Sequence, residues 1–206
     1  MGIEKHFDDS KVALLLLADE MTFRDVQRNL EIFFQQSLRF SEVHLIAAEK
    51  YTNENELRNQ HGIFQIHTVG ACDETSPDWF RDILHNSKCG QMILATGNAV
   101  WKSKYSLEHH CLQARVSGKG VSVCDDASLK MECLENKSVF GCVDSFVFST
   151  QWLLDNEICL EGISETEQSL FIADVVAAAD DREEVLNIVK GKDFSTRAQK
   201  WARSLT

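Results

Sequence analysis

The sequence predicts an α/β fold in which helices flank both faces of a mainly parallel sheet. Short apolar runs alternate along the chain with segments whose apolar residues recur at helical spacing. This alternation occurs at least four times, and right-handed crossovers place the strands of such units parallel in one sheet. The first run, Val12–Ala18, is apolar at every position, which is typical of a strand covered on both faces.

The first half of the chain supplies three expected strands, two expected amphipathic helices and a short helix expected between Glu56 and Gly62. Thr22 can cap the helix that follows the first strand, and apolar residues recur at helical spacing from Phe23 to Leu38. Pro77 is expected in the first turn of the second amphipathic helix, where its missing backbone N–H has no partner to lose. The strands expected in this half span residues 11–18, 43–48 and 63–69.

The second half continues the alternation and then changes character. A fourth strand is expected at 91–95, followed by a helix that contains His109 and His110. We expect one domain over residues 1–191 and a basic tail at 192–206 that would lead to any further region. The remaining expected elements are strands at 121–124 and 139–148 and helices at 165–179 and 181–190.

Charge, hydropathy and cysteine usage exclude several classes of protein. A net charge of -11 would repel a polyanion, so we expect no nucleic-acid binding. The longest apolar run is far below the roughly 20 residues that a membrane span needs, so we expect no span and a cytoplasmic location. The seven cysteines are an odd number without a C-x-x-C pair, which favours reduced, mostly buried thiols.

Polar residues directly follow three of the expected strands. Asp19 follows the first strand, Glu49 the second and Thr96 the fourth. Ligands of open α/β sheets bind at the carboxyl ends of strands, so these side chains are candidates for a binding site. Each also has an ordinary explanation as a polar loop residue. The sequence contains no G-x-G-x-x-G or P-loop element, which argues against dinucleotide or P-loop chemistry.

Two further pairs of residues invite a metal or acid-base role. His109 and His110 are neighbours on an expected helix, where side chains point about 100° apart and cannot easily share one ion. We therefore expect a structural role for them. Asp125 and Asp126 follow an expected strand and could hold a cation, but they also suit the start of a turn.

Two segments carry a likeness to a known family. Residues 90–101 have the sequence G-Q-M-I-L-A-T-G-N-A-V-W, and residues 164–171 have S-E-T-E-Q-S-L-F. From Lys11 to Ala179 the chain resembles the family 2 glycosyltransferases of the GT-A fold. That family has G-x-x-I-L-x-L-D-A-D-D-x-W and S-E-D-x-D-L at the corresponding places, and an acidic turn after its second strand.

The resemblance implies a GT-A-like, Rossmann-like sheet and a hexosyltransferase type of activity. The chain would transfer a sugar with inversion from a nucleotide sugar, a UDP sugar by family habit, to a glycan or other hydroxyl acceptor in polysaccharide biosynthesis. Glu167, or Glu165 as second choice, would be the catalytic base. The donor site would be lined by Asp19, Glu49, Thr96, Asn98 and Trp101.

The expected donor site departs from the family at its metal-binding pair. Thr96 and Asn98 stand where the family has the two aspartates of the D-x-D motif. A hydroxyl and an amide supply no charge for Mg²⁺ or Mn²⁺, so we assign no metal ligand and leave metal use with a UDP sugar open. Lys102, Lys104 or Arg115 could instead stabilise the departing diphosphate.

Two alternatives from other classes stay open at this point. One is a catalytically degenerate GT-A-like module that binds or assembles rather than catalyses, which the Thr96 and Asn98 substitutions favour. The other is a flavodoxin-like α/β binding module, because many folds share β-α alternation and fold alone does not determine function. The sequence also leaves open whether the chain forms a homo-oligomer.

Overall fold

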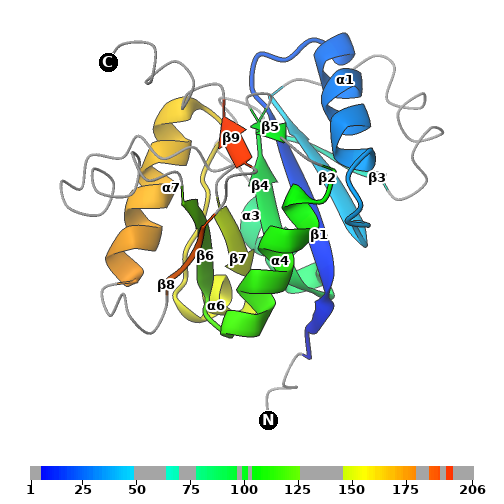
Figure 1. Cartoon of the computed structure of the whole chain (residues 1–206). Helices are drawn as coiled ribbons and strands as arrows, with labels where there is room; N and C mark the ends of the chain where they lie inside the picture. The colour runs from blue at the N-terminus through cyan, green and yellow to red at the C-terminus, as the bar shows by residue number, and fades with distance from the viewer. Residues whose placement is uncertain are drawn as a thin grey trace, which may run out of the picture.

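The computed structural model describes residues 6–48, 64–69, 78–96, 99–101, 104–125, 146–179, 186–190 and 194–196 (Figure 1). Within these residues, seven strands form one sheet in the order β3-β2-β1-β4-β7-β6-β8, and β5 pairs with β9 in a small second sheet. The strands are β1 (Asp8–Ala18), β2 (Glu42–Ala47), β3 (Phe64–Thr68), β4 (Cys89–Ala95), β5 (Ala99–Trp101), β6 (Val121–Asp125), β7 (Phe146–Ser149), β8 (Leu186–Lys190) and β9 (Phe194–Thr196). The helices are α1 (Phe23–Phe34), α3 (Trp79–Asn86), α4 (Ser106–Ser117), α6 (Thr150–Asp155) and α7 (Glu165–Ala178).

Most neighbouring strands of the large sheet run parallel, which confirms the expected mainly parallel sheet. β1 pairs in parallel with β2 and β4, β2 with β3, and β6 with β8. β7 is the exception, because it runs antiparallel to both β4 and β6. The sequence pattern does not predict this reversal, since an apolar run indicates a buried strand but not its direction.

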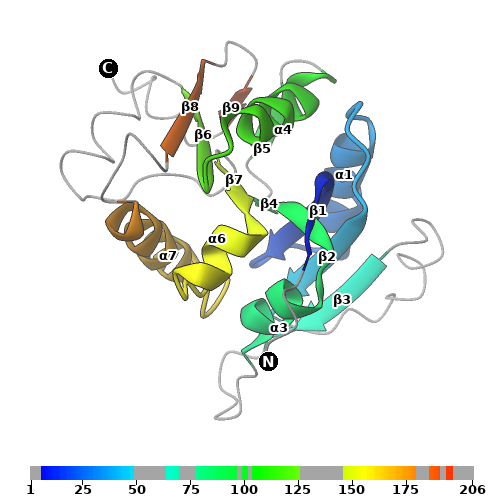
Figure 2. The same ribbon diagram turned by 90° about the horizontal axis from the view of Figure 1, so that it is seen from below.

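Helices cover both faces of the large sheet, as expected (Figure 2). Residues 12–18 of β1 are all buried, so their side chains need apolar partners on both sides of the sheet. Leu15 and Leu17 pack into a cluster with residues of α3, α6 and α7. Leu14 and Leu16 pack into a second cluster with residues of α1 and α4. The core therefore consists of two apolar layers, one on each face of β1.

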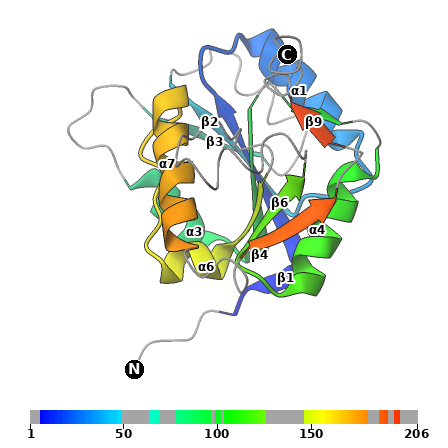
Figure 3. The ribbon, with the colours of Figure 1, turned by 60° about the vertical axis from the view of Figure 1, so that its left-hand side comes forward.

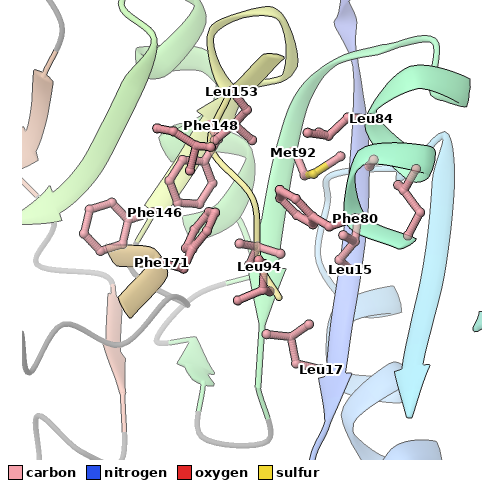
Figure 4. Packing of buried hydrophobic residues seen from close by; sticks show 14 of the residues in the cluster. Leu15, Leu17, Phe80, Leu84, Met92, Leu94, Phe146, Phe148, Leu153 and Phe171 are labelled. Atoms are coloured by element: carbon pink, nitrogen blue, oxygen red, sulfur yellow. The ribbon is translucent and has the colours of Figure 1, made fainter. Parts of the chain in front are cut away.

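Three phenylalanines join separate elements in the first of these layers (Figure 4). The ring centroid of Phe171, on α7, lies 5.6 Å from that of Phe80 and 5.5 Å from that of Phe148, and both contacts are edge-on. Aromatic pairs with this geometry add to the stabilisation that apolar burial provides. They hold α7 against α3 and β7.

Side-chain hydrogen bonds define where α1 and α7 begin. Thr22 accepts a hydrogen bond from the backbone N–H of Asp25, and the Asp25 carboxylate accepts one from the N–H of Thr22 at 3.1 Å. Ser164 and Glu167 form the same reciprocal capping box at the start of α7. The cap that the sequence predicts at Thr22 is confirmed.

The prediction of a helix at 181–190 is wrong for its second half, because residues 186–190 form β8. β8 pairs in parallel with β6, with Leu186 opposite Val121. A short segment with mixed apolar and β-branched residues suits a strand as well as a helix. The available edge of β6 supplies the hydrogen-bond partners that decide for a strand, and this edge is a tertiary feature.

Other elements differ from the expected ones in extent. The strand expected at 139–148 is described from Phe146 onward, as β7. α6 follows β7 directly and is not predicted, although Ser149 caps it by accepting a hydrogen bond from the N–H of Trp152 at 3.3 Å. Residues 194–196, within the segment expected as a tail, form β9 and pair with β5.

Polar side chains lie buried between α4 and the sheet. Gln91 Nε2 donates a hydrogen bond to the carbonyl of Cys111 at 3.0 Å. Within the described residues, Gln91 Oε1 and His110 Nε2 are buried without a hydrogen-bond partner. Burial lowers the pKa of His110 to about 4, and a hydrogen bond to the backbone of Ser122 opposes this shift only in part. His110 is therefore neutral at neutral pH.

We expect the free energy of unfolding to fall as the pH is lowered from about 6.5 to about 4. The unfolded chain takes up a proton on His110 near its ordinary pKa, whereas the folded protein resists protonation until about pH 4. This difference amounts to about 3 kcal/mol at pH 4. Urea titrations across this range should show a smaller loss of stability in His110→Leu than in the native chain.

His109→Gln is the matched control for this experiment, because His109 is the exposed neighbour of His110. It should keep most of the native pH dependence, because the charge of His109 is the smallest of the causes that shift the pKa of His110. Burial also lowers the pKa of His44, so part of the acid sensitivity should remain in both variants. A native pH dependence in His110→Leu would contradict the assignment.

Candidate functional site

The carboxyl ends of β1, β2 and β4 meet at one edge of the large sheet. Ala18, the last residue of β1, lies opposite Ala47, the last residue of β2. β4 ends beside Leu16 of β1. Asp19 and Thr96, the next residues after β1 and β4, therefore lie at the same edge, as the sequence predicts. Figure 1 shows the small β5–β9 sheet at this end of β4.

Asp19 lies half-buried in the turn that leads from β1 into α1. The next residue, Glu20, has a φ of 52°, a left-handed conformation that residues other than glycine rarely adopt. The chain turns sharply here before Thr22 caps α1. Backbone conformations of this kind are costly and concentrate at functional sites, so the turn itself is a reason to examine this edge.

The start of α7 lies at the same edge as Asp19 (Figure 3). Burial raises the pKa of Asp19, and the negative charges of Glu20, Glu167 and Glu165 raise it further. Charges shift a pKa in this way only when they lie near the group. The two glutamates that the sequence nominates as catalytic bases therefore lie within electrostatic range of Asp19, although they are far from it in the chain.

Glu167 is held in place by the cap of α7. Its Oε2 accepts hydrogen bonds from the backbone N–H of Ser164 at 3.0 Å and from the Ser164 hydroxyl at 2.7 Å. A Cβ at Gly162 would overlap the Glu167 carboxylate, so only glycine fits there without displacing it. Glu165, in the same first turn, is exposed. Gly162 is not among the residues that the sequence nominates. Its position two residues before the capping box is the only feature of the sequence that points to it.

The other nominated donor residues are described only in part. Thr96 is 7% exposed and lies directly after β4. Glu49 and Asn98 lie outside the described residues, and Trp101 is described only as backbone of β5.

The described residues at this edge do not fit a divalent cation in the place where the family holds one. Thr96 offers a hydroxyl without charge, whereas Mg²⁺ and Mn²⁺ prefer carboxylate oxygens. Among the described residues, no group of three His, Cys, Asp or Glu side chains could hold a metal ion. We therefore assign no metal ligand.

The three cations nominated for the leaving group are placed differently. Lys102 lies outside the described residues. Lys104 directly precedes the cap of α4, with its ammonium 4.9 Å from the ring centroid of Tyr105. α4 runs back along the sheet from the end of β4 toward the start of β6, which carries Arg115 about 14 Å along the helix axis from Ser106. Arg115 therefore lies away from the edge where Asp19 is found.

The remaining nominated pairs do not form a site among the described residues. Both histidines belong to α4. His110 lies on the buried side of this helix and His109 on its exposed side, as their adjacent positions on one helix predict. Asp125 ends β6 and is described only as backbone, and Asp126 lies outside the described residues. Cys89, Cys111 and Cys159 are free thiols, and the first two are buried.

The fold recurs in known proteins of low sequence identity. No family model and no curated protein matches the sequence. Residues 1–349 of S. aureus TarS, in complex with UDP-GlcNAc, superpose with a TM-score of 0.62 at 12% identity, over 89% of this chain and 57% of that one. The mannosyltransferase PcManGT from Pyrobaculum calidifontis, in complex with GDP-Man and Mn²⁺, superposes with a TM-score of 0.59 at 10% identity, over 93% and 58%.

The chain has the GT-A fold. This fold rules out the flavodoxin-like alternative. The GT-A fold is also that of nucleotidyltransferases: CMP:2-keto-3-deoxy-manno-octonic acid synthetase, complexed with CTP, superposes with a TM-score of 0.54 at 10% identity. That match covers 95% of this chain and 96% of the synthetase. The chain thus spans little more than half of PcManGT and of TarS residues 1–349, 36% of a longer TarS chain, and nearly the whole length of the synthetase.

The GT-A domain contains no membrane-crossing helix among its described residues, since none is long and apolar enough.

We expect Asp19→Asn to raise the thermal stability of the GT-A domain at neutral pH. The raised pKa of Asp19 means that folding costs free energy when its carboxylate is charged, and this cost appears as the pH rises through that pKa. The asparagine removes the charge, so the gain in melting temperature should shrink as the pH is lowered.

Asp25→Asn is the matched control, since Asp25 is a nearby carboxylate in the first turn of α1. Its hydrogen bonds to Thr22 lower the pKa of Asp25, so the charged form stabilises the fold. Asp25→Asn should therefore lower the melting temperature at neutral pH. Equal shifts in the two variants would contradict the charge repulsion at Asp19.

Proposed function

We propose that this GT-A domain binds a nucleotide sugar at the carboxyl edge of its sheet and transfers the sugar, with inversion, to a hydroxyl acceptor. The observation that carries the proposal is that Asp19, after β1, lies within electrostatic range of Glu165 and Glu167, at the start of α7. Asp19 would contact the donor, and Glu165 or Glu167 would act on the acceptor. Functional sites often contain a carboxylate whose pKa is raised, as that of Asp19 is.

Asp19 is suited to hold the nucleoside half of the donor. Its carboxylate can accept hydrogen bonds from ribose hydroxyls or from a base N–H. Its half-buried position would strengthen those bonds, because partial exclusion of water lowers the local dielectric. Thr96, at the end of β4, can donate or accept through its hydroxyl, and we propose that it faces the same ligand.

Inverting transfer needs a base on the acceptor side. The base removes the proton of the acceptor hydroxyl while its oxygen attacks the anomeric carbon, and the nucleoside diphosphate leaves with the bonding electrons. Both Ser164 hydrogen bonds reach Oε2 of Glu167, so Oε1 would take up the proton. The cap would thereby orient the base, as supporting hydrogen bonds do in designed and natural sites.

The departing diphosphate needs a positive group, because negative charge grows on it as it leaves. We propose Lys104 for this role, because it lies between the end of β4 and the start of α4. Lys102, two residues earlier in the sequence and outside the described residues, is a second candidate. An ammonium can accompany the growing negative charge on the leaving oxygen.

We expect the melting temperature to rise with nucleotides that match the donor site. A ligand present at about a hundred times its dissociation constant should raise it by roughly 5 to 10 °C. The panel comprises UDP, GDP, CMP and CTP, with UDP-GlcNAc and GDP-mannose as sugar conjugates, each with and without Mn²⁺. Asp19→Asn should weaken the response to the best ligand. If no nucleotide shifts the melting temperature, the donor site is refuted.

We expect Glu167→Gln to abolish most of the transfer while leaving the fold and donor binding intact. Glutamine preserves the capping box, since its carbonyl can accept the Ser164 hydrogen bonds, but it cannot take up a proton. Transfer from the best donor should fall by about 10² to 10⁴. Glu167→Ala should lower the melting temperature as well, because it removes the cap.

Glu165→Gln is the matched control in the same helical turn. It should keep activity if Glu167 is the base, and it should lose activity if Glu165 is the base instead. Full turnover in both variants would reject the proposal for the base.

Nucleotidyl transfer is a second candidate function, favoured by one observation. This chain and the synthetase match over nearly their whole lengths, whereas the transferases are much longer. A nucleotidyltransferase would respond to CTP or another nucleoside triphosphate in the ligand panel and would release pyrophosphate with a sugar acid or sugar phosphate. A thermal response without any turnover would instead favour the degenerate binding module, in keeping with Thr96 in place of a carboxylate.

A further inference from the structure

α4 carries a narrow apolar stripe on its outer side. Tyr105 is 56% exposed, Leu112 46% and Val116 74%, and His109 between them is also exposed. The four positions are spaced by four, three and four residues, so they fall within about 60° of one another around the helix axis. This is the spacing of a seam between two packed helices.

The opposite side of α4 already packs against its own domain. Leu107, Cys111 and Ala114 are buried in the layer between α4 and the sheet, together with His110. α4 is therefore apolar on two opposite sides: one packs against the sheet, and the other is exposed. Figure 2 shows α4 on the outside of the molecule, so its outer side can reach another molecule.

We propose that the outer side of α4 is the interface between two copies of this chain, packed antiparallel about a two-fold axis. In this arrangement Tyr105 of one copy lies beside Val116 of the other, and His109 lies beside Leu112. Each such layer occurs twice, as two-fold symmetry requires. The apolar side chains of the stripe would then be removed from water.

Charges beside the stripe favour a second copy in this orientation. Glu108 and Arg115 are seven residues apart and lie on the same flank of the stripe. An antiparallel two-fold pair places Glu108 of each copy opposite Arg115 of the other, which gives two ion pairs of opposite sign. A parallel pair would place this flank opposite Gln113 and would form no ion pair. Charge complementarity of this kind selects register and direction.

Contacts within the domain prepare the stripe for such pairing. The Ser37 hydroxyl donates a hydrogen bond to Oε2 of Glu108, which orients the carboxylate and leaves Oε1 for a second donor. The backbone N–H of Ser37 also donates to the carbonyl of Lys104 at 2.7 Å. These bonds tie the segment after α1 to the start of α4, so the stripe sits on a rigid element.

The contact of one twelve-residue helix with its copy is small, so we expect a weak dimer that forms in the micromolar range. Sedimentation velocity from low to high micromolar concentration should show a concentration-dependent shift from monomer to dimer. Leu112→Glu places a charge within the seam and should weaken dimerisation at least about tenfold. Leu170→Glu is the matched control, because Leu170 is 60% exposed on α7 and should leave the dimer unchanged.

A charge exchange tests the orientation. Glu108→Arg alone brings like charges together and should weaken the dimer about fivefold, as should Arg115→Glu alone. The double variant E108R/R115E restores both ion pairs with reversed sign, and it should recover the native dimer. A native chain that stays monomeric at high micromolar concentration overturns the proposal. So does a dimer that Leu112→Glu leaves intact or a double variant that dimerises no better than the single ones.

Discussion

The architecture depends on the complete burial of β1 on both faces. Residues 12–18 are at most 2% exposed, and they pair in parallel with β2 on one side and β4 on the other. A strand with no exposed face requires helices on both sides of the sheet, and α1 and α4 cover one side while α3, α6 and α7 cover the other. The polar residues of β1 are thereby confined to its start, and Asp19 directly follows its end. The GT-A fold presents its candidate site at such an end.

The candidate site contains features that destabilise the folded state. Asp19 is partly buried and lies near other carboxylates, so its charged form opposes folding at neutral pH. Glu20, beside it, adopts a backbone conformation that costs free energy. Features of this kind persist in a marginally stable protein when something other than stability retains them. Ligand binding is the explanation that we propose.

Glu167 shows how a structural and a chemical role can share one side chain. Its carboxylate completes the cap of α7 and is enclosed on one side by Gly162. The edge-on contacts of Phe171 hold the same helix against α3 and β7. Packing about one turn further along α7 therefore helps to hold the carboxylate in place. A glutamate that is already held in one rotamer loses little conformational entropy when a substrate binds, which is the advantage of preorganised groups.

The sequence by itself determined the class of fold, the cap at Thr22 and the positions of Asp19 and Thr96 at strand ends, because each follows from a local pattern of burial, spacing or capping. It did not determine the reversal of β7 or the strand β8, since strand direction and the choice between helix and strand depend on partners distant in the chain. Only the tertiary structure brought Glu165 and Glu167 to Asp19 and carried Arg115 away from them. The physical reason is that electrostatic and packing interactions act through space, whereas a sequence pattern records only separation along the chain.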